Sequence, residues 1–211
     1  MFKKFKLSLF NWLHKTKIYK FLLLKVIPYI RFTTYYTTFT GIKYDALSKV
    51  MQPGDVILCI DHKKLTTMLI PGTFSHAAMC VSNDSLWETS EMNHHDYDKT
   101  MLFDICQTSD RVVILRPQLP EDVITAAIER CRSFADVDYD CTFTLGVVSL
   151  YCSELVYMSY VDNSLEANLS DLVGLGKPYI SPTGLYKAKK LKVIIDSDDI
   201  DLSLSTENTT N

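Results

Sequence analysis

The sequence predicts a single domain of the α+β class, in which a small antiparallel sheet packs against helices. Short apolar segments bounded by turn residues are typical of strands, and two later segments have apolar residues at helical spacing. With 211 residues, 47% of them hydrophobic, the chain is long enough to bury one substantial core.

The expected strands are short and end at clear turn signals. Pro53-Gly54-Asp55 is a turn that leads into an apolar run. Asn83-Asp84 is a second turn, and the segments on either side of it are predicted to pair as a hairpin. The expected strands cover residues 56–60, 75–81, 85–89, 111–115 and 191–195.

Two helices are expected in the second half of the chain. The first covers 120–135, where Pro120 stands early and the acids Glu121 and Asp122 fall in the first turn. The second covers about 152–161, after a loop, and begins with a small polar sequence followed by apolar residues.

The charge is distributed unevenly along the chain. Residues 1–44 contain nine Lys or Arg and no acid, so all 25 acidic residues of the chain lie beyond them. The acidic body argues against a nucleic-acid enzyme, which would need a basic stripe at its active face. We therefore expect three parts: a basic amphipathic segment over 1–45, the domain over 46–195, and a disordered acidic tail over 196–211.

The basic segment opens with a predicted amphipathic helix. Its apolar residues share one face, with lysines opposite, as in helices that lie in a membrane interface. These residues are Phe2, Phe5, Leu9, Trp12 and Leu13. Two interpretations stay open, contact with an anionic membrane surface through residues 1–44 or docking of the helix on its own domain. Lysines interrupt every apolar stretch before Pro28, so neither a secretory signal nor a spanning helix is expected, and we predict a cytoplasmic protein, peripheral to a membrane in the first interpretation.

Three residues form the candidate catalytic set. Cys152 stands at the predicted start of a helix, where free amides and the helix dipole favour a thiolate. His76 lies in the first strand of the expected hairpin and Glu88 in the second, which can bring them onto neighbouring strands. A thiol with a histidine held by a carboxylate is the arrangement of a thiol hydrolase. Each of the three alone would more often be a structural residue.

Other polar and sulfur-containing residues carry weaker signals. Tyr139, and with it Tyr151, is a candidate for contact with substrate or with a developing oxyanion, the alternative being a packed aromatic side chain. His94-His95 with nearby acids suggests a metal loop only weakly, so no metal and no organic cofactor is expected. The six cysteines form no CxxC pair, which favours free thiols in a reducing compartment.

Six blocks in this order resemble the YiiX-like branch of the NlpC-type peptidase superfamily. They are Gly54-Asp55-Val56-Ile57-Leu58, Ser75-His76, Glu88, Tyr139-Asp140, Tyr151-Cys152-Ser153-Glu154-Leu155-Val156 and Ile180-Ser181-Pro182-Thr183-Gly184-Leu185. The similarity spans about 50–195. It implies a circularly permuted papain-like fold, in which the histidine strand precedes the nucleophile helix, with Cys152 as nucleophile, His76 as base and Glu88 as the residue that orients it.

The resemblance leaves the substrate open, because the superfamily includes peptidoglycan amidopeptidases and lipid acyltransferases. We expect a cysteine hydrolase or acyltransferase that cleaves an amide or ester bond through an acyl-enzyme. The basic N-terminus slightly favours a lipid or lipid-linked substrate. The alternatives are a cell-wall peptide amidase and a catalytically inactive membrane-peripheral binding module with the same fold.

Overall fold

The computed structural model describes residues 16–27, 30, 39–64, 67, 70, 72–82, 85–88, 98–135, 137–140, 142–171 and 177–201. Four sequence predictions fall on residues outside this set: the amphipathic helix over 2–13, the Asn83-Asp84 turn, the His94-His95 loop, and the last ten residues of the expected tail.

A six-stranded antiparallel sheet forms the centre of the molecule, in the strand order β10-β5-β1-β2-β3-β4. Its strands are β1 (Val56–Ile60), β2 (His76–Ser82), β3 (Ser85–Glu88), β4 (Asp98–Thr100), β5 (Arg111–Pro117) and β10 (Leu191–Asp196). All five predicted strands are confirmed, and so is the hairpin, since Met79 of β2 lies opposite Trp87 of β3. The sequence analysis did not predict β4, a three-residue strand of polar residues at the sheet edge.

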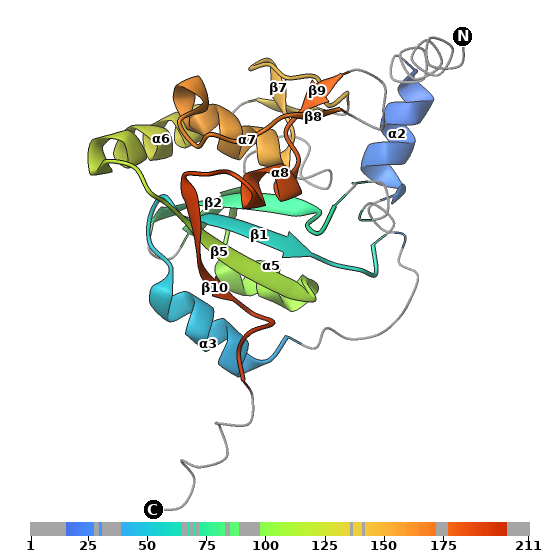
Figure 1. The fold of residues 1–211 in the computed structure, drawn as a ribbon. Coiled ribbons are helices and arrows are strands. Elements are labelled where there is room, and N and C mark those ends of the chain that lie inside the picture. The colour runs from blue at the N-terminus through green and yellow to red at the C-terminus, as the bar shows by residue number, and fades with distance from the viewer. Residues whose placement is uncertain are drawn as a thin grey trace, which may run out of the picture.

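Helices cover both faces of this sheet (Figure 1). On one side lie α6 (Glu121–Ser133), α7 (Cys152–Ser159) and α8 (Pro182–Tyr186), and on the other α3 (Gly41–Val50) and α5 (Leu102–Thr108). The pleat sends alternate side chains into the two cores, so Leu58 faces the α7 side and Ile57 the α3 side. This two-sided burial explains why β1 is an unbroken apolar run.

The turn before β1 is held by two specific features. Gly54 has φ +88°, and a Cβ added there would lie 2.3 Å from Cγ2 of Ile124, so the position requires glycine. Asp55 is 1% exposed and accepts hydrogen bonds from Nε of Arg116 at 2.9 Å and from Nη2 at 2.8 Å. The Gly-Asp pair of the sequence motif therefore fixes the start of the central strand.

The body of the fold extends beyond both expected boundaries. The boundary expected after residue 45 falls inside α3, whose Leu47 is fully buried. At the other end, Asp196 and Ser197 belong to the sheet edge rather than to a free tail. Asp196 forms an ion pair with Arg111, and Ser197 Oγ accepts a hydrogen bond from Val112 N. Local composition did not predict these two contacts, because Arg111 and Val112 lie far from Asp196 and Ser197 in the sequence.

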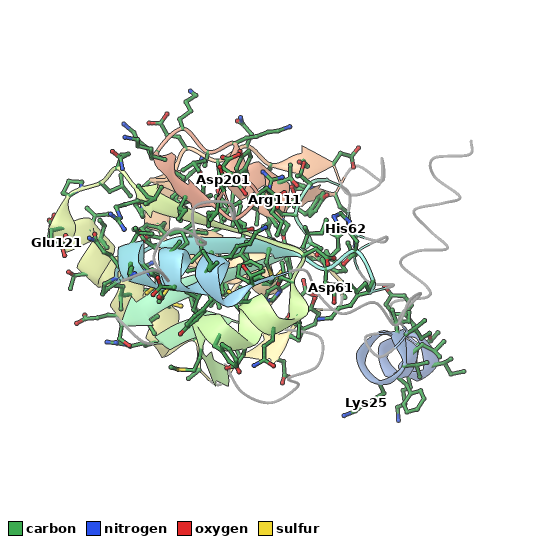
Figure 2. All side chains as sticks on the ribbon, turned by 90° about the horizontal axis from the view of Figure 1, so that it is seen from below. Lys25, Asp61, His62, Arg111, Glu121 and Asp201 are labelled. Atoms are coloured by element: carbon green, nitrogen blue, oxygen red, sulfur yellow. The ribbon has the colours of Figure 1, made fainter. Side chains whose placement is uncertain are left out.

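The helix α2 (Lys17–Lys25) stands apart from the sheet and from the helices that cover its two faces (Figure 1). Both views place it beyond the end of the sheet where β1 finishes. In Figure 2, Asp61 and His62, which follow β1, lie on the side of the body that faces the helix bearing Lys25. No helix among the described residues is long and apolar enough to cross a membrane.

Candidate active site

Cys152 is the first residue of α7, as the sequence predicted. The preceding Tyr151 is extended, with φ −100° and ψ 169°, so the helix begins abruptly at the thiol. The first amides of a helix have no acceptor within the helix, and they place a partial positive charge beside this residue. Cys152 is 6% exposed, which leaves a narrow access to its side chain.

The direction of α7 relative to β2 decides which residues lie near Cys152. At the far end of α7, the hydroxyl of Tyr160 donates a 2.7 Å hydrogen bond to Gly54 O. Gly54 N in turn donates to Cys80 O, near the carboxyl end of β2. Since α7 packs on β2, its amino end lies toward the amino end of that strand, where His76 stands.

A segment after β9 (Pro178–Tyr179) connects the two amino ends. On one side it contacts the residues that flank Cys152: Ile180 N donates to the hydroxyl of Tyr151, and Ser153 Oγ donates to Ile180 O, both at 2.9 Å. On the other side, Oγ1 of Thr183 accepts from Thr73 N at 2.9 Å and from Phe74 N at 3.2 Å. These bonds hold the residues before His76 and the head of α7 in one neighbourhood.

The position of His76 follows from the pairing of β2 with β1. Side chains of β2 alternate, with Ala77 packed on the α7 side and Ala78 on the α3 side. Strict alternation would therefore turn His76 away from Cys152. However, the carbonyl of Cys59, the register partner of His76, also accepts a hydrogen bond from Ser75 N at 3.1 Å. This bond lies one residue out of register with the pairing of β1 and β2, which is regular up to His76, so the proposed contact of His76 with Cys152 requires its side chain to depart from the alternation of the strand.

Glu88 is the last residue of β3, on the strand next to His76. Trp87 lies opposite Met79, so continuing the register puts Glu88 opposite Ala78, two residues from His76. Only the backbone of Glu88 belongs to the described part of the chain. The strand pairing thus brings the backbone positions of His76 and Glu88 near each other. A contact between their side chains does not follow from it.

The two candidate tyrosines have different settings in the fold. Tyr139 belongs to β6 (Asp138–Tyr139), which pairs in parallel with β7 (Ser149–Leu150), and is the register partner of Leu150. Tyr151 is 2% exposed, its ring lies 5.2 Å from that of Phe143, and its hydroxyl accepts from Ile180 N. Burial raises the pKa of Tyr151 above its ordinary value, so it stays neutral and anchors the segment after β9.

Two buried acids that the sequence analysis gave no role bind the loop before Cys152. Glu154 is fully buried, and its carboxyl accepts from Gly146 N at 2.8 Å and from Tyr151 N at 3.4 Å. Asp140 is 2% exposed and accepts from Thr142 N and Thr144 N, each at 2.7 Å. The glutamate two residues after Cys152, in a helical first turn, was the signal for a self-capping carboxyl.

Burial raises the pKa of Glu154 to about 8, against the lowering effect of its hydrogen bond from Gly146, and the negative charge of Asp140 raises the pKa further. Two other cysteines are buried free thiols. Burial raises the pKa of Cys106 and of Cys131 to about 12, so both are poor nucleophiles near neutral pH.

Within the part of the chain that the structure describes, no three His, Cys, Asp or Glu side chains lie close enough together to hold a metal ion. A similar solved structure is that described as the metalloprotein yiiX from Escherichia coli O157:H7. The two chains are 18% identical, the match covers 68% of this chain and 96% of that one, and the TM-score is 0.58. No curated protein matches the chain.

The order of elements agrees with a permuted papain-like fold, because the strand that bears His76 precedes the helix that begins at Cys152. The model of one protein family, described as permuted papain-like amidase enzyme, YaeF/YiiX, C92 family, matches residues 50–195. This range includes every candidate catalytic residue and all of the central sheet except Asp196, the last residue of β10. The chain therefore belongs to the permuted papain-like amidase family of YaeF and YiiX.

Proposed function

We propose that the protein is a cysteine amidase in which Cys152 is the nucleophile, His76 the general base and acid, and Glu88 the residue that orients His76. The observation that supports this most is the hydrogen-bonded segment 180–183, which binds both the head of α7 and the residues just before His76. Membership of an amidase family favours an amide over an ester as the bond that is cleaved.

The proposed reaction has two steps. Sγ of Cys152, as thiolate, attacks the carbonyl carbon of the substrate, while the helix amides stabilise the charge that develops on the oxygen. The C–N bond breaks, and the imidazolium of His76 gives its proton to the leaving amine. A water molecule then attacks the thioester while His76 takes a proton from it, the C–S bond breaks, and the acid product leaves as the thiolate of Cys152 and the imidazolium of His76 are restored.

An acyl-enzyme trap tests this assignment. The protein is incubated with p-nitrophenyl acetate, a general acylating probe, and the adduct is located by mass spectrometry. We expect one acetyl group on Cys152 and none in Cys152→Ala. The matched control is Cys106→Ala, which removes a buried thiol of raised pKa and should leave the adduct in place. An acetyl group that persists in Cys152→Ala would show that another residue reacts.

We further propose that the N-terminal segment brings the enzyme to an anionic membrane surface, where a lipid-linked amide would be the substrate. The specific support is the exposed apolar side of α2, where Ile18 is 72% exposed, Phe21 59% and Leu22 43%. These residues have the i, i+3, i+4 spacing of one helical face, and the helix contains lysines and no acid. Its position beyond the end of β1 puts it at the end of the sheet where His76 begins β2.

A further inference from the structure

The loop between β6 and β7 leads directly into Cys152, and its base and interior are both held by buried groups. At the base, Asp140 N donates to Leu150 O at 3.1 Å, next to the parallel pairing of Tyr139 with Leu150. The loop tip is exposed and apolar, with Val147 60% and Val148 89% exposed. The tip faces solvent only two residues before the strand that ends beside the nucleophile.

Two carboxyls bind the interior of this loop, one on each arm. Asp140 binds the first arm through Thr142 N and Thr144 N. Glu154 extends back from the first turn of α7 and binds Gly146 N on the second arm. The other oxygen of Glu154 accepts from Tyr151 N, so a single side chain ties the loop to the residue that precedes Cys152.

We propose that Glu154, assisted by Asp140, is a positioning residue that fixes residues 142–151 against the head of α7 and so holds Cys152 where it can react. The inference rests on the proposed role of Cys152 as nucleophile. Glu154 does not touch the reacting atoms. It acts through Gly146 and Tyr151, and its removal would free the turn at which the nucleophile stands.

The hold of Glu154 on Gly146 and Tyr151 depends on the protonation state of its carboxyl. The carboxyl of Glu154 is fully buried, and two titratable groups lie near it, Asp140 and Tyr151. Besides burial, the charge of Asp140 raises the pKa of Glu154. Burial and then the charges of Glu154, Cys152 and Asp140 raise the pKa of Tyr151. With its pKa raised to about 8, the carboxyl is neutral in the closed arrangement near neutral pH. Ionisation would bury a second negative charge beside Asp140, and opening the loop to water relieves this cost.

The closed arrangement should therefore weaken as the pH rises from about 4.5 toward 8, the value to which burial raises the pKa of Glu154, by up to about tenfold per pH unit, and the loss should level off above that value. In the wild-type protein, the proton resonance of the Gly146 amide, which bonds directly to Glu154, is expected to titrate with that midpoint. Glu154→Gln should abolish the titration. Asp140→Asn should move its midpoint down, because the neighbouring negative charge is gone. The exposed Glu129→Gln on α6 is the matched control and should leave the titration as it is.

The link to the nucleophile is tested by the rate of acetylation of Cys152 by p-nitrophenyl acetate from pH 6.5 to 9.5. The ratio of the wild-type rate to the Glu154→Gln rate should fall by up to about tenfold between pH 6.5 and pH 7.5 and should level off above about pH 8. A ratio that stays constant, or a Gly146 resonance that does not titrate, overturns the proposal. If Glu154→Gln fails to fold, the wild-type titration and its shift in Asp140→Asn decide the matter. If Cys152 is not acetylated at any pH, the proposed function fails, while the Gly146 titration still decides whether Glu154 holds the loop.

Discussion

The hydroxyl of Tyr160, at the end of α7, donates a 2.7 Å hydrogen bond to the carbonyl oxygen of Gly54, at the turn before β1. Tyr160 is 1% exposed, so this bond lies inside the core. It fixes which end of the nucleophile helix lies at which end of the sheet. The Gly-Asp motif and the Cys-Ser-Glu motif, a hundred residues apart in the chain, are thus parts of one arrangement.

Removing this hydroxyl should destabilise the fold measurably. Tyr160→Phe leaves the Gly54 carbonyl without its partner in a buried site, which costs about 1–3 kcal/mol. Urea denaturation should show a lower midpoint with an unchanged slope. Tyr157→Phe, a half-buried tyrosine on the same helix, is the matched control. Equal midpoints for the two variants would show that the bond to Gly54 contributes nothing.

Gly72 should be intolerant of any side chain because of its contact with α8. Its φ is +126°, and an added Cβ would lie 2.2 Å from Oγ1 of Thr183, the atom that binds Thr73 N and Phe74 N. We expect Gly72→Ala to lower the free energy of unfolding by about 1–3 kcal/mol and to slow acetylation of Cys152. Gly41→Ala, at a position where an added Cβ meets nothing within 4 Å, should instead be neutral or stabilising. Comparable losses for both variants would contradict the proposed crowding at Thr183.

Two buried carboxyls should give the stability opposite dependences on pH. Burial acts to raise the pKa of Asp196, but the hydrogen bond and charge of Arg111 lower it below its ordinary value. Stability from Asp196 is therefore present above the ordinary carboxyl pKa and is lost as the pH falls through the lowered one. The pKa of Glu154 is raised to about 8, so its folded state binds more protons, and stability should fall as the pH rises from about 4.5 toward 8.

Urea denaturation at several pH values separates the two carboxyls. Glu154→Gln should flatten the decline between pH 5 and 8, by up to about 1.4 kcal/mol per pH unit. Asp196→Asn should reduce stability at pH 7 and weaken the loss in acid. The predicted directions of the two pH effects are wrong if Glu154→Gln steepens the decline of stability between pH 5 and 8 or if Asp196→Asn leaves the stability at pH 7 unchanged.

The N-terminal segment should bind anionic membranes in a salt-dependent way. Each Lys or Arg near such a surface contributes about 1 kcal/mol, and the nine basic residues before Asp45 have no acid among them. The full-length protein is expected to co-sediment with phosphatidylserine-containing vesicles at low salt and to be released by 1 M salt. Ile18→Ser with Phe21→Ser should weaken binding, whereas the exposed Val193→Ser on β10 should not. Full-length protein that ignores these vesicles would remove the support for a lipid-linked substrate.

The central sheet and the helix of the nucleophile could be predicted because their signals are local. Apolar runs between turn residues located β1, β2 and β5, and the small polar start followed by apolar spacing located α7. The short helix α8 was missed, although Ser181 as cap and Pro182 at the first turn are a recognisable start. The family resemblance supplied the permuted order, and it was confirmed.

The connections within the site could not be predicted, because they join residues far apart in the sequence. Thr183 bonds the backbone at 73–74, about 110 positions earlier, and no pattern in either segment points to the other. The hydrogen bond from Ser75 N to Cys59 O likewise joins two segments that no local pattern pairs. The buried state of Glu154 follows from the packing of the β6–β7 loop, for which the sequence contains no local signal.

The most direct test of the proposed chemistry is the pH dependence of iodoacetamide labelling at Cys152. The proposed thiolate–imidazolium pair predicts labelling well below the free-thiol pKa of about 8.5, and a shift of the profile toward that value in His76→Ala. His62→Ala, which removes an exposed histidine just after β1, should leave the profile in place. A profile in His76→Ala that coincides with the wild-type profile would contradict the account, because it would show that the imidazole has no part in activating Cys152.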